Sequence, residues 1–133
     1  MNGNPDVCGA MTGGGSESIL TMMKACRDYS RFVKGIRNPE MIIGDSAHAA
    51  YFKGAEYFKI KLVMVPVGAD YRLNGKAVKK AVTRNTILVI ASAPGFPHGV
   101  VDHIEDIAQV RHSHATLPGV CEPAVVCARL IMV

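Results

Sequence analysis

Tryptophan is absent from this 133-residue chain, and aromatic side chains make up only 6% of it. Hydrophobic residues nevertheless reach 49%, and the mean hydropathy is +0.18. This composition excludes a disordered chain, because it supplies enough apolar surface to bury a core in one modest domain. The core must therefore consist mainly of valine, isoleucine, leucine, methionine and alanine.

Long apolar runs, paired cysteines and clustered charge are also missing. The longest apolar runs have the length of a strand, which is too short for a membrane span, and the polar start of the chain lacks the apolar region of a signal peptide. The chain has four cysteines, Cys8, Cys26, Cys121 and Cys127. They form neither a CxxC pair nor a zinc spacing, which indicates reduced thiols in a reducing compartment.

The formal net charge is +4, and the basic residues are scattered along the chain. The densest group is Lys76, Lys79 and Lys80, which fits the solvated face of a short helix. Because no aromatic residues alternate with these lysines, we predict no nucleic-acid partner. The mild positive charge favours an anionic, phosphate-bearing ligand.

Helical segments alternate with short apolar strands along most of the chain. The periodicity predicts helices over 16–34, 46–58, 75–83 and 102–110, and strands over 41–43, 60–65 and 87–91. Ser16 is predicted as the N-cap of the first helix and Gly35 as its C-terminal stop. The alternation predicts an α/β fold, a mostly parallel sheet with helices on both faces.

The pattern changes after residue 110. His112, His114 and Pro118 interrupt the periodicity, and the chain closes with an apolar run over 124–133. Two interpretations of that run stay open, a strand and an apolar tail without a native packing partner. Residues 111–133 are therefore predicted to be a divergent C-terminal tail, either non-native or alternatively spliced.

A glycine-rich turn leads directly into the first predicted helix. It reads Thr12-Gly13-Gly14-Gly15-Ser16. Glycines let the backbone approach a ligand, and the free N–H groups of a helix start favour an anion. The turn lacks the Gly-Lys-Ser/Thr end of a nucleotide P-loop, so it predicts a phosphate or carboxylate site, with a plain tight turn as the alternative.

Two further segments follow predicted strands. Ligands of open parallel sheets gather beyond the carboxyl ends of the strands, where His48 lies; an ordinary capping or surface histidine is the alternative. The loop from Ser92 to Gly99 contains two prolines and two glycines around His98, and such rigid loops often carry binding residues. A purely structural loop is the alternative there.

Together, these segments resemble successive motifs of the sphingosine-1-phosphate lyase family, in the group II decarboxylase-like branch of the fold-type I pyridoxal-phosphate enzymes. The matching residues are 8–18, 46–51 and 94–102, with Arg84-Asn85-Thr86 before the strongest strand. The resemblance covers about residues 1–110, and the loop Phe96-Pro97-His98-Gly99 makes it specific to the lyases. It implies that residues 1–110 are part of the large, cofactor-binding domain.

The resemblance also implies which residues form the site. Gly14, Gly15 and Ser16 occupy the positions of the family's Gly-Gly-Thr turn, which holds the phosphate of pyridoxal 5′-phosphate. His48 matches the histidine that stacks on the pyridine ring. Ser92 is assigned to cofactor binding and His98 to the surrounding pocket, and no metal is implied.

This chain departs from the family pattern in three respects. Gly13 stands where a serine is usual, which removes a hydroxyl from the phosphate cradle. The family's His-Val-Asp strand, whose aspartate pairs with the pyridine nitrogen, has no match over 111–117, and no lysine lies in the context of the Schiff-base lysine. The resemblance therefore implies a truncated internal segment that is inactive by itself.

The implied activity is cleavage of sphingosine 1-phosphate, a phosphorylated long-chain base, into a fatty aldehyde and phosphoethanolamine. An amino-acid decarboxylase of the same branch is one alternative, and a non-catalytic phosphate- or cofactor-binding fragment is another. Family members are homodimers, and the eukaryotic ones face the cytosol from the endoplasmic reticulum. They are held there by an N-terminal anchor that this chain does not show.

Overall fold

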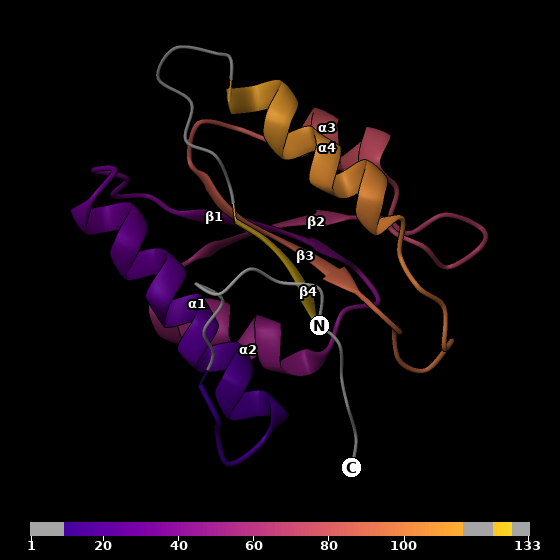
Figure 1. The fold of residues 1–133 in the computed structure, drawn as a ribbon, viewed down its shortest axis with the longest axis horizontal. Helices are drawn as coiled ribbons and strands as arrows, with labels where there is room; N and C mark the ends of the chain where they lie inside the picture. Colours follow the sequence, from indigo (N-terminus) through magenta and orange to yellow (C-terminus); the bar gives the residue numbers. More distant parts are fainter. Residues whose placement is uncertain (1–9, 116–123, 129–133) are drawn as a thin grey trace, which may run out of the picture.

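The computed structural model describes residues 10–115 and 124–128. Helices and strands alternate through these residues, beginning with a helix (Figure 1). Their bounds are α1 Gly15–Phe32, β1 Glu40–Gly44, α2 Ala49–Phe58, β2 Lys61–Val65, α3 Gly75–Ala81, β3 Thr86–Ser92, α4 Ile104–Ala115 and β4 Ala124–Ala128.

The strands form one parallel sheet in the order β2-β1-β3-β4. Met41 of β1 is in register with Leu62 of β2 on one side and with Leu88 of β3 on the other. Leu88 in turn is in register with Ala124 of β4. The predicted parallel sheet is therefore confirmed, and its two central strands are the predicted apolar runs over 41–43 and 87–91.

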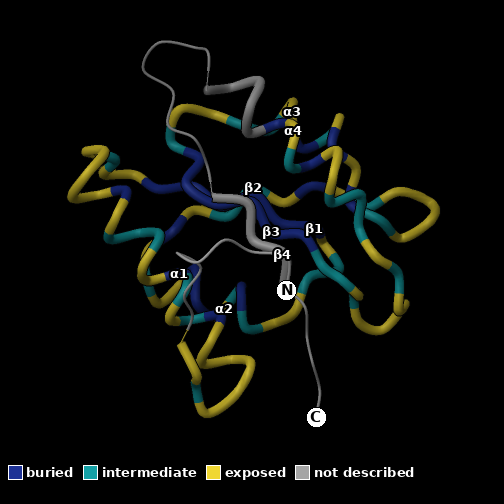
Figure 2. The backbone as a smooth tube through the Cα atoms, in the orientation of Figure 1, coloured by how far each residue is buried: buried dark blue, intermediate teal, exposed yellow. Residues whose placement is uncertain are grey.

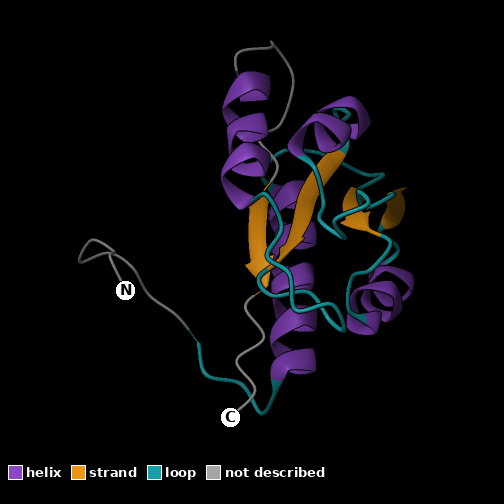
Figure 3. Cartoon of the chain, turned by 90° about the vertical axis from the view of Figure 1, so that its right-hand side faces the viewer, coloured by secondary structure: helices purple, strands orange, loops and turns teal. Residues whose placement is uncertain are grey.

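Helices cover both faces of the sheet, as predicted. α1 and α2 pack on one face and α3 and α4 on the other (Figures 1 and 3). The side chains of β1 alternate between the two layers, as strand geometry requires: Met41 and Ile43 face α1 and α2, and Ile42 faces α3 and α4. Since both faces are covered, all five residues of β1 are buried (Figure 2).

Glycines allow each pair of helices to approach closely. A Cβ atom on Gly54 of α2 would lie 2.7 Å from Sδ of Met23 and 2.9 Å from a methyl carbon of Leu20, both in α1. At Gly75, the first residue of α3, it would lie 2.8 Å from Cβ of Asp106 and 2.9 Å from its carbonyl carbon, in α4. The side chains that a Cβ atom at Gly54 would meet are flexible, whereas a Cβ atom at Gly75 would also meet the backbone of α4.

Several predicted boundaries differ from the structure. α2 begins at Ala49 rather than at residue 46, because Asp45–Ala47 form a turn and His48 caps the helix. Gly35 has a φ of 69° beyond the end of α1, which is consistent with the predicted stop. Cys26 is a free thiol whose pKa is raised by burial; Cys8 and Cys121 lie outside the described residues.

The C-terminal part contains more regular structure than the sequence pattern predicts. α4 continues through His112 and His114 to Ala115. Residues 124–128 form β4, so the strand interpretation of the last apolar run is correct for these five residues. The division at residue 110 stays a prediction, since residues 116–123 and 129–133 lie outside the described part. None of the helices in the described residues is long and apolar enough to cross a membrane.

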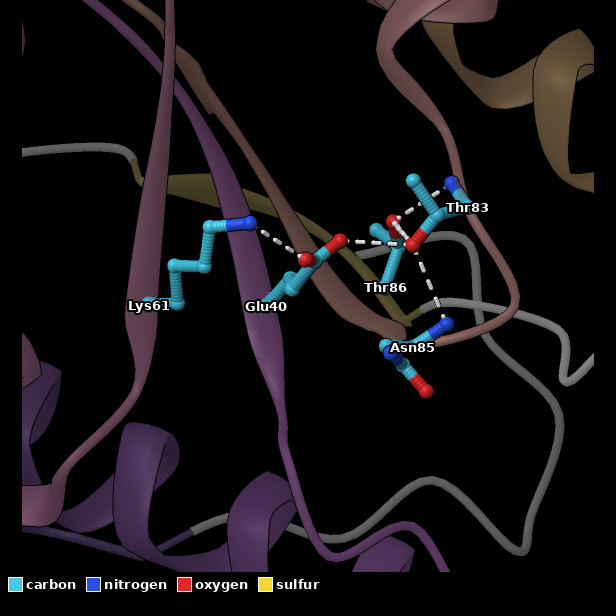
Figure 4. Close-up of polar contacts among 5 residues, drawn as sticks. All are labelled: Glu40, Lys61, Thr83, Asn85 and Thr86. Carbon is cyan, nitrogen blue, oxygen red and sulfur yellow. Dashed lines mark hydrogen bonds and ion pairs between the residues drawn. The ribbon is translucent and has the colours of Figure 1, made fainter.

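A hydrogen-bond network joins the amino ends of three strands (Figure 4). The Glu40 carboxylate, in β1, accepts from Nζ of Lys61 in β2 at 2.9 Å and from the hydroxyl of Thr83 at 2.6 Å. The Thr83 backbone N–H donates to the hydroxyl of Thr86, in β3, at 2.9 Å, and its Oγ1 accepts from the Asn85 N–H at 3.1 Å. These bonds hold the pKa of Glu40 below its ordinary value, with the Thr83 bond as the larger cause and the Lys61 bond next.

Candidate functional site

The candidate residues gather toward the opposite edge, where the parallel strands end. β1 leads through a short turn to His48, and β3 ends at Ser92 and leads into the loop over 93–103. α1 runs back along the sheet to enter β1, so it also begins toward this edge. Its 18 residues span about 27 Å, whereas the five residues of β1 span about 17 Å. Figure 3 shows the start of α1 extending beyond the ends of the strands.

The glycine turn is held by hydrogen bonds between its own residues. The Thr12 hydroxyl donates to the carbonyl oxygen of Gly14 at 3.1 Å and lies 2.5 Å from the hydroxyl of Ser18. The Gly13 N–H donates to Oε2 of Glu17 at 2.6 Å. A Cβ atom at Gly13 would lie 2.9 Å from that same oxygen, so the glycine gives the Glu17 carboxylate room to fold back.

The first turn of α1 carries no side-chain cap. Gly14 is the N-cap residue, so the prediction that Ser16 is the cap is wrong; Ser16 is the second residue of the helix. Because the first N–H groups of a helix have no intrahelical acceptor, they remain available to an anion. The space around Gly14 and Gly15 is open, and the exposed Ser16 side chain bonds to no other described residue. These features fit a phosphate group.

His48 is the N-cap residue of α2. Its Nδ1 accepts a hydrogen bond from the N–H of Ala50 at 3.1 Å, so the neutral ring carries its proton on Nε2. The capping alternative is therefore correct for one side of the imidazole. His48 is also exposed, which leaves the ring face and Nε2 available to a ligand. Its contact with a cofactor stays a prediction.

Ser92 is tied to the far end of the following loop by Asp102. The Ser92 N–H donates to Oδ2 of Asp102 at 2.6 Å, and the Asp102 N–H donates to the carbonyl oxygen of Ser92 at 3.0 Å. The other carboxylate oxygen of Asp102 accepts from the N–H of Leu73 at 2.7 Å. One carboxylate thus closes the loop over 93–101 and attaches it to the segment before α3.

His98 lies on that loop against a second aromatic ring. Its imidazole stacks on Tyr71, with ring centroids 4.0 Å apart and planes 21° apart. Nearby, Nε2 of His103 lies 3.6 Å from Oδ2 of Asp70. In the sequence, Asp102 is notable only as the end of a motif, and Tyr71 belongs to none of the predicted site segments. An acidic residue at the start of a predicted helix is a signal that could have found Asp102, whereas Tyr71 offers no such signal.

Among residues 10–115, the candidate residues of the three segments make no polar or ring contact with one another. No hydrogen bond, ion pair or ring contact joins Gly14, Gly15 or Ser16 to His48, or any of these four residues to Ser92 or His98. Hollows of about 450 Å³ and 460 Å³ lie between α3 and α4 and at the start of α4. Neither is lined by Gly14, Gly15, Ser16, His48, Ser92 or His98.

Several curated relatives of this chain are sphingosine-1-phosphate lyases, although no protein-family model matches it. The sphingosine-1-phosphate lyase of Arabidopsis thaliana is 51% identical over 115 residues, which are 86% of this chain and 20% of the relative. Sphingosine-1-phosphate lyase 1 of Rattus norvegicus is 47% identical over 110 residues, 83% of this chain and 19% of the relative. This chain belongs to the sphingosine-1-phosphate lyase family. It spans about a fifth of the length of these relatives.

Solved structures agree with this family and with the predicted fold. The Burkholderia pseudomallei sphingosine-1-phosphate lyase matches with a TM-score of 0.78 and 29% identity, over 86% of this chain and 25% of that one. Oryza sativa TDC with PLP and tryptamine matches with a TM-score of 0.72 and 21% identity, over 87% and 26%, and shows the fold alone. The chain is thus part of the fold-type I pyridoxal-phosphate-dependent transferase fold.

The lyase family pattern places an aspartate on the strand that follows the last helix. In this structure, that strand is β4, which pairs with β3. Its residues are Ala124, Val125, Val126, Cys127 and Ala128, so β4 carries no carboxylate. That this chain lacks the acidic partner of the pyridine nitrogen stays a prediction.

Proposed function

We propose that this segment serves a pyridoxal-phosphate-dependent carbon–carbon lyase that cleaves sphingosine 1-phosphate into a fatty aldehyde and phosphoethanolamine. The observation that carries the proposal is the 51% identity with the Arabidopsis thaliana lyase over 86% of this chain. The fold agrees with it, since the Burkholderia pseudomallei lyase matches with a TM-score of 0.78. The mild positive charge suits a phosphorylated substrate.

In this proposal, the described residues hold the cofactor on one side. The first N–H groups of α1 and the Ser16 hydroxyl bind its phosphate, with Gly14 and Gly15 leaving room for the oxygens. His48 covers the ring, and Ser92 borders it from the end of β3. When bound, pyridoxal phosphate accepts the electron pair released as the carbon–carbon bond breaks.

We extend the proposal to the whole enzyme and to the division of this chain. We propose that activity requires the Schiff-base lysine and the acidic partner of the pyridine nitrogen from elsewhere, and that the 133-residue chain alone is inactive. We further propose that residues 1–110 belong to the large domain and 111–133 to a divergent tail. The whole enzyme would be a homodimer facing the cytosol at the endoplasmic reticulum.

A chimera tests the activity. This chain would replace the matching segment of the Arabidopsis thaliana lyase, and the release of fatty aldehyde from sphingosine 1-phosphate would be measured. We expect cleavage, with no release of carbon dioxide from aromatic or acidic amino acids. A folded, cofactor-loaded chimera that decarboxylates amino acids and leaves the long-chain base phosphate intact would refute the lyase assignment.

The chain alone is tested separately. After addition of pyridoxal phosphate and borohydride reduction, we expect either no adduct or scattered adducts on several lysines by mass analysis. A single adduct on one specific lysine would show that a complete site assembles within these 133 residues, and the proposal of inactivity would fall.

A further inference from the structure

Two loops meet at the carboxyl edge of the sheet, the loop over 66–74 before α3 and the loop over 93–103 after β3. The Asp102 carboxylate joins them, since it accepts from the N–H of Leu73 at 2.7 Å and from the N–H of Ser92 at 2.6 Å. The side chains of Asp70 and His103 form a second bridge at 3.6 Å. The loops are thus attached at their bases.

Tyr71 connects the same loops at their exposed ends. Its φ of 59° lies in the left-handed region, which is unfavourable for a bulky residue. A tight turn imposes this conformation: the Tyr71 N–H donates to the carbonyl oxygen of Gly68 at 2.9 Å, and the Gly68 N–H donates to that of Arg72 at 3.0 Å. In this turn the Tyr71 ring lies on the imidazole of His98, with the two ring centroids 4.0 Å apart.

The stack is what orients His98. Tyr71 is 53% exposed and His98 is exposed as well, so core packing fixes neither ring. A histidine on an exposed loop would otherwise exchange among rotamers. Within the described residues, the ring contact with Tyr71 is the interaction that holds the imidazole side chain.

We propose that Tyr71 is a positioning residue that fixes the imidazole of His98 at the edge of the sheet where β3 ends at Ser92. A fixed imidazole can present a ring nitrogen to a hydroxyl or phosphate group of the substrate in a single orientation. The inference rests on the proposed function, because it assigns Tyr71 to the pocket that contains His98.

Two variants of Tyr71 and one control separate the effect of its ring from that of its backbone conformation. Tyr71→Phe keeps a ring to stack on, whereas Tyr71→Gly removes the ring and favours the left-handed backbone, so the turn is retained. Tyr29→Ala is the matched control: Tyr29 is 55% exposed, lies on α1, and its ring contacts Lys34 at 5.4 Å instead of a histidine.

The first readout is the NMR spectrum of the chain labelled with ¹³C-histidine, which contains five histidines. The His98 signals are assigned by their loss in His98→Asn. We expect the ring current of residue 71 to shift them upfield in the wild type and in Tyr71→Phe, and we expect Tyr71→Gly to lose the shift. Identical His98 signals in the wild type and Tyr71→Gly would overturn the inference.

The second readout is turnover in the chimera described above. We expect Tyr71→Gly to lower kcat on the order of tenfold with a smaller change in KM, and Tyr71→Phe and Tyr29→Ala to stay near the parent chimera. An unchanged kcat after loss of the stack would overturn the positioning role. A parent chimera without lyase activity would instead overturn the proposed function and with it the catalytic part of the inference, while the NMR comparison still decides the stack.

Discussion

Replacing Glu40 by glutamine is expected to destabilise the chain in a pH-dependent manner. Glu40 is only 7% exposed, and its two carboxylate oxygens bond separately to Lys61 and to the Thr83 hydroxyl (Figure 4). Glutamine has almost the same shape, but it loses the charge and has only one accepting oxygen. The substitution therefore tests the charge and its bonds with little change in packing volume.

The two bonds differ in their expected contributions. The Lys61 side chain is 71% exposed, so its ion pair with Glu40 contributes about 0–1 kcal/mol. The bond from the Thr83 hydroxyl to the buried carboxylate, at 2.6 Å, contributes about 1.5–3 kcal/mol. Since glutamine keeps one accepting oxygen, we expect Glu40→Gln to lower the free energy of unfolding by about 2 kcal/mol at pH 7.

The sign of the pH dependence follows from the lowered pKa of Glu40 in the folded chain. In the unfolded chain, the carboxyl group returns to its ordinary pKa of 4.5. The stabilisation by Glu40 is therefore complete above about pH 4.5 and is lost as the pH falls through the lower pKa of the folded state. The difference between the wild type and Glu40→Gln should accordingly shrink in acid.

Urea unfolding of both proteins at pH 7 and at successively lower pH measures this difference. Glu56→Gln is the control, because Glu56 is exposed on α2 and its removal should change the stability by no more than about 0.5 kcal/mol. Equal unfolding midpoints for the wild type and Glu40→Gln at pH 7 would refute the reasoning. A difference that persists undiminished in acid would show that shape, not charge, is responsible.

Further substitutions test packing and the candidate site. Gly75→Ala should destabilise by about 1–3 kcal/mol in urea unfolding, and by more than Gly54→Ala, because the added methyl group meets the backbone of Asp106 instead of flexible side chains; equal effects would contradict this. Gly13→Ser should slow loss of pyridoxal phosphate from the chimera during dialysis a few-fold, since the flexible Glu17 carboxylate moves aside and the serine adds a hydroxyl donor to the cradle; faster loss would contradict that role. His48→Ala should lower the free energy of unfolding by about 1 kcal/mol because it removes the cap of α2. His48→Asn should keep this stability and still alter the absorbance of the bound cofactor in the chimera. An unaltered spectrum in both variants would mean that His48 serves only as a helix cap.

The elements of this fold are determined largely by local sequence. β1 and β3 are continuous apolar runs because helices cover both of their faces, and such runs are recognisable without a structure. The glycine turn before α1 and the loop after Ser92 are likewise visible as clusters of residues that break periodic patterns. The local pattern mispredicts the end of α4: it predicts that the helix ends at residue 110, whereas the helix continues through His112 and His114.

The candidate site was predictable only in part. Family resemblance predicted the residues of the glycine turn, His48, Ser92 and His98, but no local rule indicates that His48 caps a helix through Nδ1. Ser16 was predicted as a cap from its residue type, and the structure places the cap at Gly14 instead. Helix boundaries shift by one or two residues when a turn supplies the same hydrogen bonds, and sequence alone does not fix that balance.

By itself, the sequence determined the α/β class, the alternation of elements and the family of this chain. Only the tertiary structure decided the strand order β2-β1-β3-β4 and the contacts between segments that are remote along the chain. Asp102 reaches Leu73, Glu40 reaches Thr83, and Tyr71 stacks on His98. Burial and backbone periodicity leave a local pattern in the sequence, whereas a contact between two loops depends on how the whole sheet brings its strand ends together.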